Sequence, residues 1–256
     1  MSILKKFSLS QFHNINYGDS CYIFGDGGST KNYDLKHFQN LPSICCGKMF
    51  LRKNFNYLNT LYYTIPEPRL FWPNFFPMVQ RLKDNKEVGK LLKEKILELD
   101  NINFFLNATN FSFISGKNIN FIHRSISKIE FPTKIDPFAG SFKTVLSLAY
   151  HFGFKKVYLI GFDSFTKSSF SDLRWYEYGK IKGVFNRSII ENRIIDFYKE
   201  KMDITSIGLT DKDSINFKSI SYKEFTGESP KYLENYELTT NKNLKILSTQ
   251  PYHKMQ

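Results

Sequence analysis

The chain has 256 residues, of which 41% are hydrophobic and 23% charged, and this balance excludes a largely disordered protein. The length suits one large domain that can bury a core without disulfides or metal ions. Lys and Arg outnumber Asp and Glu by 36 to 24, which favours anionic partners. The positive charge is scattered, without arginine-rich runs or finger spacing, so we expect no nucleic acid among them.

The cysteines and the N-terminal segment indicate the compartment. Cys21, Cys45 and Cys46 lie in apolar runs, and an odd number of thiols with two adjacent predicts buried free cysteines in a reducing compartment. Residues 1–14 lack the apolar core and cleavage site of a signal peptide, and no run reaches the ~20 apolar residues of a membrane span. We expect a cytoplasmic protein. Its charge is compatible with peripheral contact with an anionic membrane, and a homo-oligomer is left open.

Apolar runs alternate with amphipathic segments along most of the chain. The expected strands are 20–24, 41–46, 61–65, 104–107, 111–114, 119–123, 156–160 and 204–209. The expected helices are 30–39, 87–99, 138–152 and 186–201. Prolines and aromatic residues over 66–77 predict a loop or lid. This alternation predicts an α/β fold with a mostly parallel sheet covered by helices on both faces, and such sheets bind ligands at the carboxyl ends of their strands.

A glycine-rich loop follows the first expected strand. It consists of Gly25, Asp26, Gly27, Gly28 and Ser29. Glycines let backbone N–H groups approach a phosphate closely, and the start of a helix adds a partial positive charge. The Asp26 carboxylate would repel a phosphate and suits a ribose hydroxyl or the nucleoside end. The loop lacks the G-x-G-x-x-G and Walker patterns. It predicts a nucleotide site, and the alternative is a tight strand-to-helix turn that binds no ligand.

A second block runs from Gly140 and Ser141, at the start of a helix, to Gly161-Phe162-Asp163 after a strand. With the glycine loop, it resembles bacterial sialyltransferases of the Campylobacter lipooligosaccharide type (glycosyltransferase family 42-like). It also resembles the related motility accessory factors and 6-hydroxymethylpterin diphosphokinase-like proteins. The resemblance implies a Rossmann-like domain over 1–215 with the lid at 66–77, followed by a polar C-terminal extension at 216–256, and no cofactor or metal.

The same resemblance implies the site residues. Those around a cytidine nucleotide are Gly25, Asp26, Gly27, Gly28, Ser29, Gly140, Ser141 and Asp163. This sequence departs from the family at the loop asparagine, which is Asp26, and at a second asparagine, which is Gly47. The family's two phosphate-stabilising tyrosines fall on Phe165 and Phe170, and its histidine base falls on Asn186, whose amide cannot take a proton at neutral pH. Residues between these positions are candidate replacements: Arg174, Trp175, Tyr176, Glu177 and Tyr178.

The function that the resemblance implies is transfer of a sialic-acid-like sugar from a CMP-activated donor to a surface glycan or lipid-linked acceptor, as in lipopolysaccharide biosynthesis. Two alternatives stay open: a motility-accessory or pterin diphosphokinase-like protein, and a non-catalytic descendant that binds a nucleotide or glycan. Asp211 and Asp213 form a D-x-D pattern that a chance surface match explains best. No histidine is spaced for zinc, so we expect no metal site.

Overall fold

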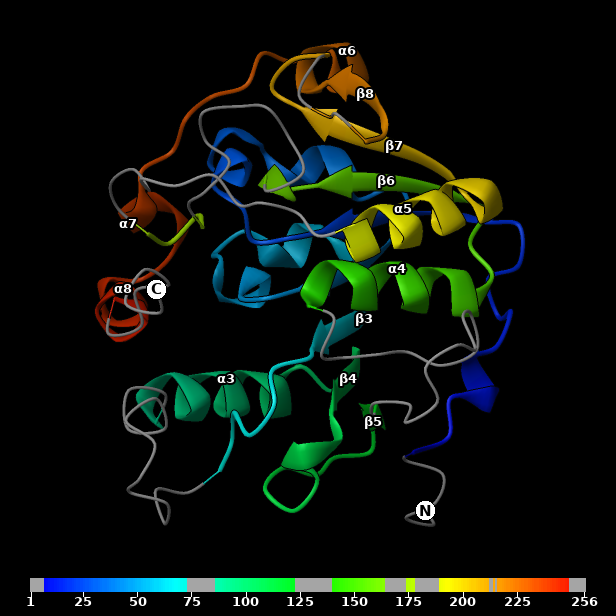
Figure 1. Ribbon diagram of the computed structural model, residues 1–256. Helices are drawn as coiled ribbons and strands as arrows, with labels where there is room; N and C mark the ends of the chain where they lie inside the picture. Colours follow the sequence, from blue (N-terminus) through cyan, green and yellow to red (C-terminus); the bar gives the residue numbers. More distant parts are fainter. Residues whose placement is uncertain are drawn as a thin grey trace.

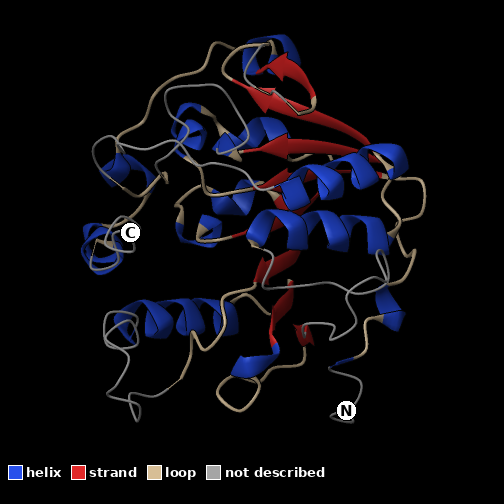
Figure 2. Cartoon of the chain, in the orientation of Figure 1, coloured by secondary structure: helices blue, strands red, loops and turns tan. Residues whose placement is uncertain are grey.

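The computed structural model describes residues 7–72, 86–122, 140–163, 174–177, 189–211, 214 and 216–248, with 189–194 as backbone only. Eight strands form one parallel sheet in the order β5-β4-β3-β2-β1-β6-β7-β8 (Figures 1 and 2). The strands are β1 Ser20–Phe24, β2 Pro42–Cys46, β3 Asn59–Ile65, β4 Asn103–Asn107, β5 Ile119–Ile122, β6 Lys156–Ile160, β7 Asp203–Gly208 and β8 Lys218–Ser221. The predicted α/β fold is confirmed.

Helices cover both faces of the sheet. The α-helices are α3 Lys86–Glu98, α4 Ser141–Phe152, α5 Ile189–Lys201, α6 Tyr222–Thr226, α7 Asn235–Leu238 and α8 Asn241–Leu247. In Figure 1, α4 and α5 lie together on one face. Alternate residues of β1 belong to two separate cores: Cys21 and Ile23 pack with α4 and α5, whereas Tyr22 and Phe24 pack with α3, α6 and α8. Strands buried on both faces explain the continuous apolar runs in the sequence.

The order of the strands reverses beside β1. From β1 the chain builds outward through β2, β3, β4 and β5, and it then returns to place β6 on the other side of β1. The carboxyl ends of β1 and β6 therefore form the topological switch point, where open parallel sheets bind their ligands. Gly25 follows β1 there and Gly161 follows β6, so both motifs that the sequence singles out meet at this point.

Two expected elements differ in the structure. The helix expected over 30–39 is replaced by two 3-10 helices, η2 Gly28–Asn32 and η3 Leu35–Phe38. The break falls at Tyr33, which is buried and stacks on Tyr222, and Asp34 then caps η3 by accepting a hydrogen bond from the Lys36 N–H. The strand expected over 111–114 is a turn, because β4 pairs directly with β5 and leaves Phe111 to pack on Phe121.

The C-terminal part of the described chain continues the fold. β8 pairs in parallel with β7, and Leu244 and Leu247 of α8 are buried in the core, so the sheet crosses the expected boundary between residues 215 and 216. The remaining 3-10 helices are η1 Ser10–Phe12, η4 Met49–Leu51, η5 Phe55–Tyr57 and η6 Ala108–Asn110. All three cysteines are buried and free, as predicted. Within the ranges given above, the helices are too short or too polar to traverse a bilayer.

Candidate nucleotide-binding and active site

The glycine loop is packed against the turn that follows β6. The Gly25 N–H donates to the Ile160 carbonyl at 2.8 Å, and the Gly27 N–H donates to the Gly161 carbonyl at 2.9 Å. A Cβ at Gly25 or Gly27 would approach the Gly161 carbonyl oxygen to 2.5 or 2.6 Å, closer than real Cβ atoms come. Glycine is therefore required at these positions because two backbones touch.

Asp163 closes the same turn from the other side. Its carboxylate accepts hydrogen bonds from the Ser29 N–H at 2.7 Å and the Ser29 hydroxyl at 2.5 Å, and both residues are buried. The N–H groups of Gly25, Gly27 and Ser29 are thus engaged within the protein. This differs from the expectation that the loop turns these groups toward a phosphate, because the approach of β6 supplies acceptors for them. The loop forms a rigid floor, and an anionic ligand needs other partners.

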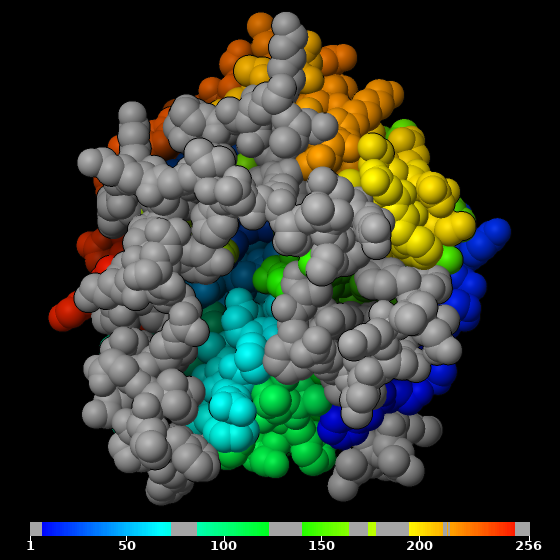
Figure 3. Space-filling view, viewed as in Figure 1, coloured from blue at the N-terminus to red at the C-terminus, as the bar shows by residue number. Residues whose placement is uncertain are grey.

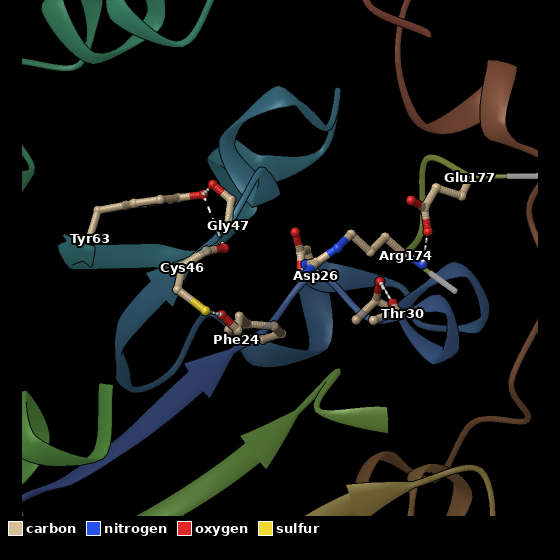
Figure 4. Close-up of polar contacts among 9 residues, drawn as sticks. Phe24, Asp26, Thr30, Cys46, Gly47, Tyr63, Arg174 and Glu177 are labelled. Carbon is tan, nitrogen blue, oxygen red and sulfur yellow. Dashed lines mark hydrogen bonds and ion pairs between the residues drawn. The ribbon is translucent and has the colours of Figure 1, made fainter. Parts of the chain in front are cut away.

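The segment 174–177 is fixed across the glycine loop. Arg174 forms an ion pair with Asp26, its backbone makes an antiparallel bridge with Gly27, and the Trp175 N–H donates to the Asp26 carbonyl at 3.0 Å (Figure 4). The Arg174 N–H also donates to the Glu177 carboxylate at 3.0 Å. The structure therefore brings three of the residues that the sequence singled out, Asp26, Arg174 and Tyr176, to one edge of the sheet.

One oxygen of the Asp26 carboxylate is left without a partner. Oδ1 meets Arg174, whereas Oδ2 is buried and accepts no hydrogen bond from the described residues. Oδ2 lies directly over Gly47, whose φ of +68° and missing Cβ make room for it. The turn at Gly47 is held by Tyr63, whose hydroxyl donates to the carbonyls of Gly47 at 3.1 Å and of Cys46 at 3.3 Å (Figure 4). A buried acceptor without a donor is uncommon in a folded protein and calls for an explanation, such as a ligand or an ordered water.

Lys48 is a partly buried cation that the sequence did not single out. It follows Gly47 at the carboxyl end of β2, and its ammonium lies 5.3 Å from the centroid of the Tyr176 ring. Burial lowers the pKa of Lys48, but Tyr176 and Asp26 outweigh this effect and the net pKa is above the ordinary lysine value. Burial raises the pKa of Tyr176 to about 12, so its hydroxyl stays protonated at neutral pH. A polar residue just after a buried strand was the available signal for Lys48.

The start of α4 faces the same edge. In Figure 1 its first turn lies on the side toward which the strands point, and Phe142 packs on Phe162 at 5.2 Å between ring centroids. Gly140 precedes the helix with φ +88°, and Ser141 is its first residue and partly exposed. Figure 3 shows described segments coloured blue, cyan and green side by side near the centre of the view.

Several predicted residues lie outside the described residues: Tyr178, Asn186, Phe165, Phe170 and Asp213. Asp211 is described and exposed. Across the described ranges, no cluster of three or more His, Cys, Asp or Glu side chains could hold a metal ion.

Comparison with known proteins gives two similar structures. No protein-family model matches the chain, and no curated protein sequence matches it. The sialyltransferase CstII from Campylobacter jejuni, solved with the substrate analogue cytidine-5'-monophosphate, aligns at 14% identity over 92% of this chain and 99% of its own, with a TM-score of 0.43. The monofunctional α-2,3-sialyltransferase Cst-I from the same organism aligns at 17% identity over 93% and 96%, also with a TM-score of 0.43.

Proposed function

We propose that this protein is a glycosyltransferase that moves a sialic-acid-like sugar from a CMP-activated donor to a hydroxyl of a surface glycan or lipid-linked acceptor. The observation that carries the proposal is the charged cluster at the switch point of the sheet. There Asp26 offers an unpartnered oxygen, and Arg174 and Lys48 supply positive charge. A CMP-sugar needs this combination, since it carries hydroxyl donors on its sugars and negative charge on its phosphate.

Each side chain has a role in the proposed reaction. Oδ2 of Asp26 accepts a hydrogen bond from a hydroxyl of the donor. The packed turn that supports Asp26 consists of Gly25, Gly27, Gly28, Ser29 and Asp163. Lys48, Arg174 and the Tyr176 hydroxyl stabilise the departing phosphate, because pre-arranged donors act most strongly where charge develops in a partly buried site. Gly140 and Ser141 add the positive end of α4 and a hydroxyl at the same edge.

Calorimetric titration with CMP, CDP, UDP and ADP tests the donor class. We expect CMP to bind with the highest affinity, and an absence of binding to any cytidine nucleotide would remove the proposal. Ser141→Ala should weaken CMP binding by more than its shift in melting temperature explains, because Ser141 begins the helix and Gly140, not Ser141, caps it. Lys143→Ala, in the first turn of α4, is a matched control for changes on that helix.

A surface glycan or lipid-linked acceptor would place the protein in lipopolysaccharide biosynthesis. It would work there in peripheral contact with an anionic membrane. The net charge of +12 supports such contact. Sedimentation with vesicles that contain 30% anionic lipid, against neutral vesicles, measures it directly. Binding that is equal for both kinds of vesicle, or absent from both, would contradict this part.

A further inference from the structure

The carboxylates at the switch-point edge differ in what they bind. Both oxygens of Asp163 accept hydrogen bonds from Ser29, and Asp26 is held by the guanidinium of Arg174. One oxygen of Glu177 accepts the Arg174 N–H. Oε2 of Glu67 and Oδ2 of Asp26 are both buried and accept no hydrogen bond from the described residues, but of these two carboxylates only Asp26 forms an ion pair with one of them. A buried acceptor without a donor is uncommon in a folded protein, so this oxygen of Glu67 is open to a donor from a ligand.

The backbone of Glu67 is held firmly in place. It follows Ile65, the last residue of β3, by two positions, and two asparagines beyond β4 anchor this exit. Asn107 donates to the Pro66 carbonyl at 3.1 Å, and Asn110 donates to the Glu67 carbonyl at 3.0 Å. The side chain itself is half-buried. The backbone at Glu67 is therefore held by side-chain donors, while one oxygen of its carboxylate has no donor among the described residues.

Glu67 lies between the charged cluster and an aromatic turn. On one side, Glu67 follows β3, which pairs in parallel with β2, so it leaves the sheet at the same edge as Gly47 and Lys48. On the other side, the chain turns within five residues to Trp72, whose indole N–H donates to the Thr109 carbonyl at 2.6 Å. The Trp72 ring also lies 5.1 Å from the Arg69 guanidinium and 5.7 Å from the Phe113 ring, measured from its centroid. An acceptor sugar on this turn would meet the donor next to Glu67.

We propose that Glu67 is the general base of the transfer, a role that rests on the proposed function. The acceptor hydroxyl oxygen forms a bond to the anomeric carbon of the donor sugar, and its proton passes to the Glu67 carboxylate. The bond between the anomeric carbon and the phosphate oxygen breaks, and its electron pair leaves with CMP. Glu67 then returns the proton to water. The Asn186 amide cannot perform this step, and one oxygen of the Asp26 carboxylate is already held by the guanidinium of Arg174.

Glu67→Gln tests the proposal, because glutamine keeps the shape of the side chain and cannot accept a proton. The assay follows CMP release from CMP-N-acetylneuraminate, with lactose and with water as acceptors. We expect release to slow about 100-fold or more, within the usual range for loss of a general base. The affinity for CMP should stay within about twofold. Glu67→Asp should recover part of the rate, and the acid limb of the pH–rate profile should vanish in Glu67→Gln. Glu98→Gln, an exposed change on α3, is the control.

The outcomes separate the two proposals. If the parent protein binds no cytidine nucleotide or releases no CMP, the proposed function fails, and the role of Glu67 fails with it. If the parent protein is active and Glu67→Gln releases CMP within threefold of its rate, only the role of Glu67 is overturned. A variant that loses CMP affinity and activity in equal measure overturns that role as well, because Glu67 would then position the donor.

Discussion

The Asp163 carboxylate receives two hydrogen bonds from Ser29, although the residues are separated by 134 positions in the chain. This contact joins the exit of β6 to the exit of β1 and holds the glycine loop against the sheet. It places both groups in the interior, where an unpaired polar atom is costly. The rigidity of the loop therefore depends on a charged side chain that the sequence motif had assigned to the ligand.

Asp163→Ala should lower the free energy of unfolding by about 3 kcal/mol, because the Ser29 N–H and hydroxyl lose a charged acceptor. Urea unfolding followed by circular dichroism measures the loss. Ser29→Ala is the matched control, and it should cost about half as much, because the backbone N–H still reaches Asp163. The proposed binding to CMP should weaken in Asp163→Ala, because the glycine loop loses the hydrogen bonds that hold it against the sheet. An unfolding free energy within about 0.5 kcal/mol of the parent would contradict this account.

Gly47→Ala should destabilise the protein by about 3 kcal/mol or more. Its φ of +68° costs an alanine ~1 kcal/mol, and the new methyl group would also collide with the Asp26 carboxylate. Gly227 offers a matched control, because its φ is +80° and nothing lies within 4 Å of the position of a Cβ. Gly227→Ala should therefore show only the backbone cost. Equal losses in the two variants, measured by thermal unfolding, would rule out the close contact between Asp26 and Gly47.

The stability of the N-terminal contact with α4 should depend on pH. Burial lowers the pKa of His151, and the nearby His13 lowers it further, while the hydrogen bond to the Leu9 carbonyl opposes this. The unfolded chain therefore binds a proton more readily than the folded protein. The stability that His151 contributes is complete above its unfolded pKa of about 6.5 and is lost as the pH falls through the folded value.

His151→Gln should reduce the drop in urea midpoint between pH 7 and pH 5. His37→Gln, on a different face beside Tyr222, is the control and should keep the drop of the parent protein. A pH dependence that is the same in the parent protein and in both variants would show that His151 is not the group responsible.

The sequence predicted the strands of the sheet well because both of their faces are buried. β1 and β6 were expected within their observed bounds, since four consecutive apolar residues between polar turns leave little alternative. β8 was missed because its sequence KSIS is polar and only partly buried, so its position depends on pairing with β7. The break at Tyr33 was missed for a similar reason, because its cause is the ring of Tyr222, 189 positions later.

The site was predicted by motif and not by contact. The glycine loop and Asp163 were found because glycines directly after a buried strand mark a tight turn or a ligand site. Nothing in the local sequence indicates that Asp163 bonds to Ser29, or that Arg174 crosses 148 positions to reach Asp26. Lys48 and Glu67 were missed because a single charged residue after a strand resembles any polar turn. Only the parallel order of β1, β2 and β3 brings their exits together.

The ion pair between Asp26 and Arg174 should couple folding to ligand affinity. Asp26 is almost fully buried, whereas the Arg174 side chain is 29% exposed. Removing the arginine therefore leaves an unpaired buried charge, which costs more stability than an unpaired arginine at a partly exposed position. Arg174→Met should therefore destabilise the protein more than Asp26→Asn. In a double-mutant cycle by urea unfolding, the coupling energy should be about 1–2 kcal/mol, which allows for the screening of a partly exposed guanidinium. The surface pair Lys95 and Glu98 is the control, and its coupling should be at most about 0.5 kcal/mol.

The same variants measured with CMP separate fold from function. Asp26→Asn replaces the unpartnered acceptor by an amide, so it should weaken the proposed CMP binding by about tenfold while costing less stability than Arg174→Met. That factor corresponds to about 1.4 kcal/mol, the value of one hydrogen bond to a charged group. Titration calorimetry at one salt concentration gives the comparison. If CMP affinity follows stability alone across the four proteins of the cycle, Asp26 and Arg174 only brace the loop, and neither contacts the ligand.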